Sequence, residues 1–323
     1  MNKRKIINVY ILIFCMLLCG CSSGKRYKTS DLSLGTIEDL PVIEYTSAGE
    51  EYVLVSANET LNADAYQSVA SALLLDTTDN EVIVSYNPHD TLYPASMTKI
   101  MTGLLVIEAI EAGDISLDDV VTLESTVTFT ESNVGVSNLV GGCKIDIKNL
   151  LYGLLIKSYN DCAVILAREV AGSEDAFVEL MNERAQELGA TNTHFVNPHG
   201  LHSDEHYTTA YDLYLIFQEF TSHDLAYVID SCTSYDFTYT DGENVEHQVE
   251  ISPTNGFLSG EYSFPEGYSL GSWKSGTTSA AGSCLIIEFV NDSTGNKYYG
   301  VIAGAATRAD LYTAMISLVN EIN

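Results

Sequence analysis

The sequence predicts an α+β domain in which one antiparallel sheet of about five strands is flanked by helices, with a helical subdomain inserted. Two expected strands come early, at residues 69–76 and 81–86, and three come late, at residues 269–277, 284–290 and 298–305. The segment between the two groups is largely helical in pattern. When strands at the two ends of a chain enclose a helical middle, the early and late strands are expected to pair in one sheet.

The first helix of this body is expected directly after the first two strands, which are themselves joined by the turn at residues 77–80. Pro94 cannot continue a helix and Ser96 is a natural cap, so the helix should begin at Ser96. It should end at the Gly113–Asp114 break. Apolar residues occupy nearly its whole circumference, which indicates a helix buried in the centre of the domain.

Further helices are expected at residues 147–157, 161–170 and 209–220, and a last one from Arg308. A turn-rich stretch follows the third of them. The middle of the chain is therefore predicted to contribute helices, not strands.

An export signal is expected at residues 1–20, where three basic residues precede an apolar run and the ending Leu18-Cys19-Gly20-Cys21. The apolar run is short for a membrane span. The ending resembles the lipobox of bacterial lipoproteins, which implies that Cys21 is lipidated and becomes the new N-terminus. An uncleaved anchor helix, or a signal cut elsewhere, is the alternative. The lipobox reading implies an extracytoplasmic protein, anchored by lipid to the outer face of the bacterial cell membrane.

Residues 21–66 are rich in Ser, Thr, Gly and acidic side chains and are predicted to be a lipid-anchored tether, with an extended segment around residues 52–55. Residues 67–323 are expected to form the functional domain. The whole chain carries 44 Asp and Glu against 15 Lys and Arg, a formal charge of −29. This charge argues against nucleic acid as a partner.

Four cysteines follow Cys21, and export would permit disulfides between them in three pairings. They are Cys143, Cys162, Cys232 and Cys284. None stands in a C-x-x-C spacing, which argues against a structural zinc site. Cys162 lies in an expected apolar helix and Cys284 beside an expected strand, so we expect these two to be small buried apolar residues.

The first candidate for chemistry is the pair Ser96 and Lys99, three residues apart at the start of the buried helix. This spacing places both side chains on one helical face, where backbone N–H groups have no partner. A serine needs a neighbouring base to become a nucleophile, and a lysine acts as that base only if burial or nearby positive charge lowers its pKa. The pattern is short, and Ser22 to Lys25 matches it too.

Two further patterns supply polar groups that such a site needs. Ser158-Tyr159-Asn160 falls between two expected helices, where a polar loop needs an explanation, although Asn160 or Asp161 as a helix cap would be one. Lys274-Ser275-Gly276 lies inside an expected strand, which would hold the lysine cation and the serine hydroxyl in fixed positions beside the buried helix. A solvated lysine on an edge strand is the alternative.

These patterns occur in longer runs that resemble the serine D-alanyl-D-alanine carboxypeptidases, the low-molecular-weight penicillin-binding proteins of peptidase family S11. The likeness extends from about Ala70 to the final helix. It is carried by residues 94–102, 150–161, 197–201 with 206–210, and 274–276 with 281–282. It implies a β-lactamase/transpeptidase-like fold, no cofactor and no metal.

The resemblance implies that Ser96 attacks the carbonyl between the two terminal D-alanines of a peptidoglycan stem pentapeptide. Lys99 would take its proton, and Ser158 would pass a proton to the departing D-alanine. Substrate binding would fall to Asn160, Lys274, Ser275, Thr277 and Arg308. The hydroxyl of Ser275 stands where the family usually has threonine, so its rotamer is less restricted. β-Lactam antibiotics are implied as covalent inhibitors.

Three other functions would use some of the same residues. A class A-like β-lactamase is disfavoured because no E-x-x-x-N spacing occurs in the chain. A lipid-anchored penicillin or muropeptide receptor with little turnover would keep all three patterns. A metallopeptidase would need His199, His202 and His206 as ligands, but Pro198 and Gly200 indicate a loop there, and the chain has no H-E-x-x-H.

Overall fold

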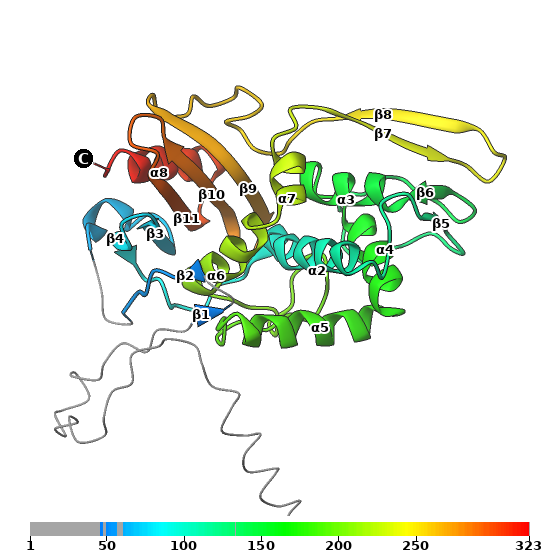
Figure 1. Cartoon of the computed structure of the whole chain (residues 1–323), viewed down its shortest axis with the longest axis horizontal. Coiled ribbons are helices and arrows are strands. Elements are labelled where there is room, and N and C mark those ends of the chain that lie inside the picture. The colour runs from blue at the N-terminus through cyan, green and yellow to red at the C-terminus, as the bar shows by residue number, and fades with distance from the viewer. Residues whose placement is uncertain (1–45, 48–49, 57–60, 133, 323) are drawn as a thin grey trace, which may run out of the picture. The chain divides into compact units, whose positions relative to one another are not determined.

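The central sheet of the computed structural model, which describes residues 46–47, 50–56, 61–132 and 134–322, has five antiparallel strands in the order β4-β3-β11-β10-β9 (Figure 1). The strands are β3 (Ser71–Asp76), β4 (Glu81–Tyr86), β9 (Tyr268–Thr278), β10 (Gly282–Asn291) and β11 (Lys297–Ala305). Both ends of the body contribute strands, as predicted, and β9 forms one edge of the sheet.

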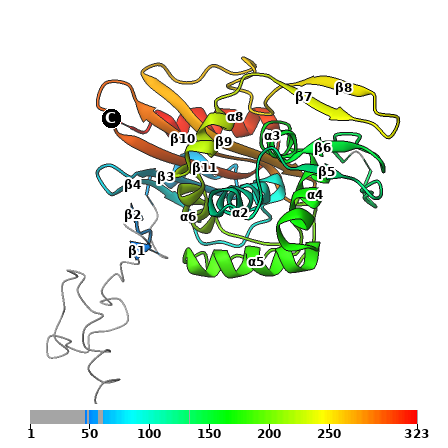
Figure 2. The same ribbon diagram turned by 45° about the vertical axis from the view of Figure 1, so that its right-hand side comes forward.

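Helices cover both faces of this sheet (Figure 2). The described helices are η3 (Ala63–Tyr66), η4 (Ala95–Thr98), α2 (Lys99–Ala112), α3 (Ile147–Ile156), α4 (Asn160–Ala171), α5 (Glu174–Glu187), α6 (Ala210–Thr221), α7 (Asp224–Asp230) and α8 (Arg308–Val319). Alternate residues of β3 point to opposite faces, so Leu73 packs with α2 and α6 and Leu74 packs with α8. As predicted, α2 is buried along most of its length.

A second, four-stranded sheet was not predicted. It contains β5 (Val120–Thr122), β6 (Lys144–Asp146), β7 (Tyr235–Thr240) and β8 (Glu246–Ile251), and the β7–β8 hairpin projects beyond α3 (Figure 1). The hairpin lies in the stretch that composition indicated to be turn-rich. Most of β8 is exposed to solvent, so it lacks the apolar alternation by which a half-buried strand is found.

The packed body begins before residue 67, where the tether was expected to end. Two short strands, β1 (Thr46–Ser47) and β2 (Glu50–Glu51), pair with each other. Tyr52, Val53 and Val55 are buried in the main core, and the backbone N–H of Val53 donates to the Tyr214 hydroxyl at 3.0 Å. The expected extended segment at residues 52–55 therefore belongs to the domain and not to a tether.

Cys21 and the expected export signal lie outside the described residues. Within the described part of the chain, no helix has both the length and the apolar character required to cross a membrane. Cys162 and Cys284 are buried, which confirms the prediction made for these two residues. Cys143 is also buried and Cys232 is half-buried, and all four of these cysteines are free.

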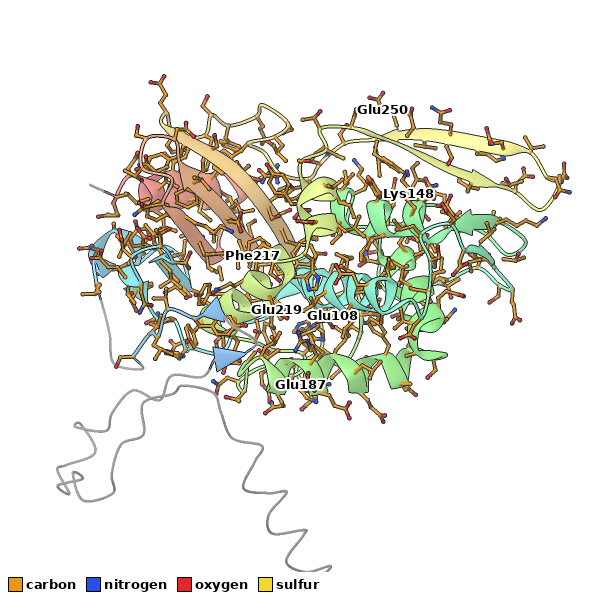
Figure 3. The ribbon with its side chains drawn as sticks, in the orientation of Figure 1. Glu108, Lys148, Glu187, Phe217, Glu219 and Glu250 are labelled. Atoms are coloured by element: carbon orange, nitrogen blue, oxygen red, sulfur yellow. The ribbon has the colours of Figure 1, made fainter. Side chains whose placement is uncertain are left out.

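An ion-pair network joins the three helices α2, α5 and α6. Arg184 of α5 pairs with Glu108 of α2 at 2.7 Å and with Glu219 of α6 at 2.5 Å, and also with Glu187 of its own helix. The three glutamates are labelled in Figure 3. The side chains of Arg184, Glu108 and Glu219 are only 21–28% exposed. Their role is structural, because they join α2, on which Lys99 is the first residue, to its neighbours.

Candidate active site

The turn that carries Ser96 is a short 3-10 helix, and the α-helix begins only at Lys99. The prediction that the helix starts with Ser96 as its cap was therefore wrong in detail. Ala95 has a left-handed backbone with φ of 47°, a conformation that costs free energy for a residue with a Cβ. The Thr98 hydroxyl donates to the Ala95 carbonyl at 2.8 Å and closes the turn. Ser96 is thus held on a strained turn.

Lys99 is fully buried, with three oxygen atoms around its Nζ. They are Ser96 Oγ at 3.1 Å, Asn160 Oδ1 at 2.8 Å and the His199 carbonyl at 2.6 Å. Burial holds the pKa of Lys99 well below its ordinary value, and the positive charge of Lys274 lowers it further. A neutral amine has two N–H donors and one lone pair. Because the amide and carbonyl oxygens only accept, neutral Lys99 directs its lone pair toward the Ser96 hydroxyl.

Ser158 lies at the turn between α3 and α4, also with a left-handed backbone, φ 63°. Lys274 Nζ donates to Ser158 Oγ at 3.1 Å and to the Ser275 carbonyl at 3.2 Å. Lys274 is 1% exposed, so it is not the solvated edge-strand lysine that was the alternative interpretation. Burial lowers the pKa of Lys274 to about 8, against the opposing effect of the Asp230 carboxylate. The Ser158 hydroxyl therefore accepts from a cation and keeps its own proton to donate.

Asn160 uses both ends of its side-chain amide within the protein. Its Oδ1 accepts from Lys99, and its Nδ2 donates to the Gly135 carbonyl at 3.0 Å. The next residue, Asp161, is buried and does not cap α4. It accepts from the backbone N–H and the hydroxyl of Ser137. Burial raises the pKa of Asp161. Together these bonds attach the segment around Gly135 to the turn that carries Ser158.

A close approach of backbones brings β9 against the Ser96 turn. A Cβ on Gly276 would lie 2.8 Å from the backbone nitrogen of Ser96, and one on Gly200 would lie 1.9 Å from the Ala95 carbonyl oxygen. Only glycine fits at these two positions. The space in front of the turn is a cavity of about 720 Å³, and its lining includes Ser96, Ser158, Asn160 and Thr277.

The two expected carboxylate-binding residues, Ser275 and Arg308, both contact Thr254. Ser275 Oγ is 2.9 Å from the hydroxyl of Thr254, so a neighbouring side chain limits the freedom that serine was expected to have. Arg308, the first residue of α8, donates to the Thr254 carbonyl at 3.0 Å and pairs with Glu261 at 3.0 Å. Of the residues predicted as substrate-binding, Asn160 and Thr277 line the cavity and Lys274 contacts Ser158. Ser275 and Arg308 are joined through Thr254.

The three histidines weighed as metal ligands each have another partner. His199 Nδ1 accepts from the Leu201 backbone N–H, and His202 lies 3.4 Å from Asp204. His206 is buried, with Nδ1 accepting from the Val196 backbone and Nε2 lying 2.8 Å from the Thr98 hydroxyl. Burial lowers the pKa of His206 to about 4. His206 therefore supports the Ser96 turn.

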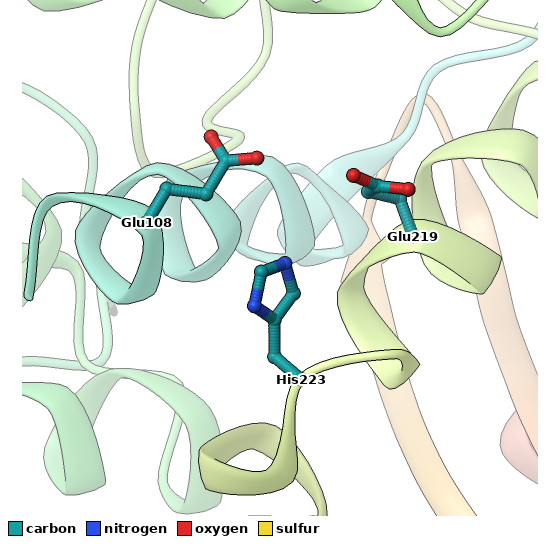
Figure 4. Close-up of side chains that lie close together, drawn as sticks. All are labelled: Glu108, Glu219 and His223. Atoms are coloured by element: carbon teal, nitrogen blue, oxygen red, sulfur yellow. The ribbon is translucent and has the colours of Figure 1, made fainter. Parts of the chain in front are cut away.

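A different group has donor atoms close enough for a metal ion among the described residues. It comprises Glu108, Glu219 and His223, whose ligand atoms lie within 4.8 Å of one another (Figure 4). Arg184 already bridges the two carboxylates, and Glu111 pairs with the histidine ring at 2.9 Å. The two carboxylates of this cluster belong to the ion-pair network described above, and none of its three residues lines the cavity.

Several residues of the site were missed by the sequence reasoning. The His199 carbonyl and the Gly135 carbonyl act through backbone atoms, which leave no side-chain signal. Thr254 contacts Ser275, and Glu261 contacts Arg308, so each has a partner that is distant in the sequence. Both residues lie in a turn-rich stretch that contains no motif. His206 stood in the run that carried the family resemblance, but its bond to Thr98 is visible only in the fold.

The family model of the D-alanyl-D-alanine carboxypeptidases, Peptidase_S11, matches residues 57–306. The chain is 41% identical over 150 residues to D-alanyl-D-alanine carboxypeptidase DacF of Bacillus subtilis, a match that covers 46% of this chain and 38% of that protein. It is 37% identical over 147 residues to D-alanyl-D-alanine carboxypeptidase DacD of Escherichia coli, a match that covers 44% of this chain and 38% of that protein. The chain thus matches less than half the length of these curated relatives.

Solved structures of penicillin-binding proteins share the fold. Penicillin-binding protein D2 of Listeria monocytogenes, in its cefotaxime-bound form, aligns with a TM-score of 0.66 at 23% identity, covering 79% of this chain and 97% of that one. DacD of Francisella tularensis aligns with a TM-score of 0.66 at 24% identity, covering 85% and 73%. The expected β-lactamase/transpeptidase-like fold is confirmed.

Proposed function

Because the chain belongs to the D-alanyl-D-alanine carboxypeptidase family, we propose that it removes the terminal D-alanine from peptidoglycan stem pentapeptides through an acyl-enzyme on Ser96. The observation that carries this proposal is the environment of Lys99 Nζ. Two of its three neighbours can only accept hydrogen bonds, and the third is the Ser96 hydroxyl. This arrangement suits a lysine that acts as a neutral base toward the serine.

In the first step, Ser96 Oγ forms a bond to the carbonyl carbon between the two D-alanines while its proton passes to Lys99. The developing oxyanion would lie between the backbone N–H groups of Ser96 and Thr277, where each donor lowers the barrier by about 3–4 kcal/mol. The C–N bond then breaks, Ser158 supplies the proton for the departing D-alanine, and the proton held by Lys99 passes to Ser158, which leaves Lys99 neutral again. Lys274 would keep Ser158 oriented through their 3.1 Å hydrogen bond.

In the second step, water attacks the acyl carbon while its proton passes to Lys99. The bond from Ser96 Oγ to the acyl carbon then breaks, Lys99 returns the proton to Ser96 Oγ, and the shortened stem peptide leaves. The site also suits β-lactam antibiotics, whose ring carbonyl would acylate Ser96 in the same way. A related structure is described in a cefotaxime-bound form. Ser275 and Arg308 would hold the terminal carboxylate, and Asn160 would contribute to the acyl side of the cavity.

The test is time-resolved mass spectrometry of the folded domain with penicillin and, in parallel, with diacetyl-Lys-D-Ala-D-Ala. We expect a persistent adduct on Ser96 and release of D-alanine. Ser96→Ala should lose both, whereas Ser279→Ala, which alters another serine of the cavity lining, should keep both. An adduct without release of D-alanine would favour a penicillin or muropeptide receptor, and rapid turnover of penicillin would favour a β-lactamase.

We also propose that the protein is an extracytoplasmic lipoprotein held at the outer face of the cell membrane through Cys21. The basic segment, apolar run and final Leu-Cys-Gly-Cys of residues 1–21 support this. Two acyl chains on a diacylglyceryl group are sufficient for stable anchoring. In cells fed labelled palmitate, the native chain should carry the label and Cys21→Ser should not. Equal labelling of both proteins would refute the anchor.

A further inference from the structure

The environment of Arg308 differs from what a simple carboxylate-binding arginine requires. A guanidinium has two edges that can grip a carboxylate with two parallel hydrogen bonds, one formed by Nε with Nη2 and one by Nη1 with Nη2. Glu261 Oε2 lies 3.0 Å from both Nε and Nη2, and so occupies the first edge. The Thr254 carbonyl accepts from Nη2 at 3.0 Å, and so occupies one of the two donors of the second edge, Nη1 with Nη2. A substrate carboxylate therefore meets an arginine whose two-bond edges are both engaged.

The two groups bound to Arg308, the Glu261 carboxylate and the Thr254 carbonyl, differ in how easily a substrate carboxylate could displace them. The Thr254 carbonyl is part of the backbone, and its side-chain hydroxyl is fixed at 2.9 Å from Ser275 Oγ. Glu261 is a surface side chain, 47% exposed, paired with an arginine side chain that is 42% exposed. Ion pairs with this exposure are weak and exchange readily. Glu261 is thus the group that an incoming carboxylate can displace.

The face of the guanidinium is also fixed, which keeps Arg308 in place when Glu261 leaves. The Arg308 guanidinium carbon lies 5.0 Å from the centre of the Tyr312 ring, in a cation–π contact. The Tyr312 hydroxyl accepts from the Gly256 backbone N–H at 2.6 Å, which ties the ring to the segment that carries Thr254. Loss of Glu261 would therefore free one edge of the guanidinium without removing its other supports.

We infer that Glu261 is a built-in competitor for the substrate's terminal carboxylate and sets how tightly that carboxylate is bound. The inference rests on the proposed function, because it assumes that the substrate ends in a free carboxylate held beside Ser275 and Arg308. Glu261 is a specificity-determining residue in this sense: it lowers the advantage of a peptide with a C-terminal carboxylate over the same peptide with a C-terminal amide. The hydrogen bond from Arg308 lowers the pKa of Glu261, which favours its charged form.

The first test compares the native chain with Glu261→Gln, using diacetyl-Lys-D-Ala-D-Ala and its C-terminal amide. We expect the KM for the carboxylate peptide to fall about two- to fivefold, the range for an exposed ion pair, with kcat unchanged. Cleavage of the amide peptide should not change. A matched control is Glu266→Gln, on the same exposed segment, for which the described residues show no ion pair.

The second test places the substitution in an Arg308→Gln background, where Glu261→Gln should have no further effect. An unchanged or raised KM for the carboxylate peptide in Glu261→Gln would overturn the inference, and so would an equal change with the amide peptide. Penicillin labelling of Ser96 separates this failure from the wider one. If Ser96 is labelled and the KM does not move, only the competitor is refuted. If Ser96 is never labelled and no peptide is cleaved, the proposed function fails as well.

Discussion

The hydroxyl of Thr98 is expected to hold the Ser96 turn in its working shape, and Thr98→Val tests this. Valine keeps the volume and branching of threonine but has no hydroxyl. Because His206 Nδ1 accepts from the Val196 N–H, its Nε2 carries the proton and donates to Thr98. The Thr98 hydroxyl in turn donates to the Ala95 carbonyl. The substitution therefore leaves two polar groups without these partners in a fully buried place.

The expected magnitude follows from that count. A buried group that loses its hydrogen-bond partner costs about 1–3 kcal/mol, so the two together cost roughly 2–6 kcal/mol of the free energy of unfolding. For a domain of this size each kcal/mol lowers Tm by about 2–4 °C, so Tm should fall by at least about 4 °C. Ala95 loses the bond that closes its strained turn, and Ser96 is displaced. A misplacement of about 1 Å costs up to roughly 100-fold in rate.

Two measurements check this prediction: a thermal melt, and the rate at which fluorescent penicillin acylates Ser96 well below Tm. Thr98→Ser restores the hydroxyl and should behave nearly as the native chain. Thr221→Val is the control for destabilisation alone, because the Thr221 hydroxyl also has two partners, Tyr299 and the Gln218 carbonyl, on a helix end remote from the cavity. It should lower Tm and leave acylation unchanged. The reasoning is refuted if Thr98→Val acylates at the native rate, or if Thr98→Ser is as slow as Thr98→Val.

Two further predictions concern pH. Burial holds the pKa of His206 at about 4, below its ordinary 6.5, so the unfolded chain binds this proton first. The contribution of His206 to the free energy of unfolding should fall by up to roughly 3 kcal/mol between pH 6.5 and 4, whereas Asp230, whose pKa is raised by burial to about 7, acts in the opposite direction. Urea titrations at the two pH values should therefore show a less unfavourable change for His206→Gln than for the native chain; an equal change would contradict this. The pKa of Lys274, lowered by burial to about 8, predicts that acylation slows above that pH as Ser158 loses its cationic partner. Lys274→Arg, which stays charged, should be slower but without this alkaline fall, and the same fall in both proteins would count against the assignment.

The central sheet and the buried helix were predictable because their residues carry a strong local signal. β10 and β11 are apolar along almost their whole length, and β4 was placed at the observed residues. The β7–β8 hairpin carries a weak signal, because most of β8 faces solvent. The boundary at residue 67 was misplaced for a related reason: the short segment around Val53 is held by a partner, Tyr214, that only the fold brings near.

In the candidate site, too, contacts between residues close in the sequence were predictable, and contacts between distant segments were not. Ser96 and Lys99 lie on one turn, so their spacing alone predicted the 3.1 Å contact. The His199 carbonyl that accepts from Lys99 is a backbone atom 100 residues away, and any residue type would provide it. Asn160 was expected to hold the substrate, yet its amide is engaged by Lys99 and Gly135. That engagement depends on the path of the segment around Gly135, which sequence spacing does not encode.

The two buried lysines of the site have different partners, and this difference assigns their roles. Burial lowers the pKa of both, and the charge of Lys274 also acts against a proton on Lys99. The Asp230 carboxylate favours the proton on Lys274, and the Asp161 carboxylate favours the proton on Lys99, but only for Lys99 is the charge of the other lysine among the causes that lower the pKa. The oxygens in direct contact with Lys99 belong to neutral groups. When only one of two neighbouring amines can be charged, the proton remains on the amine with the higher pKa. Lys274 therefore acts as the cation beside Ser158, and Lys99 is left neutral to take the proton of Ser96.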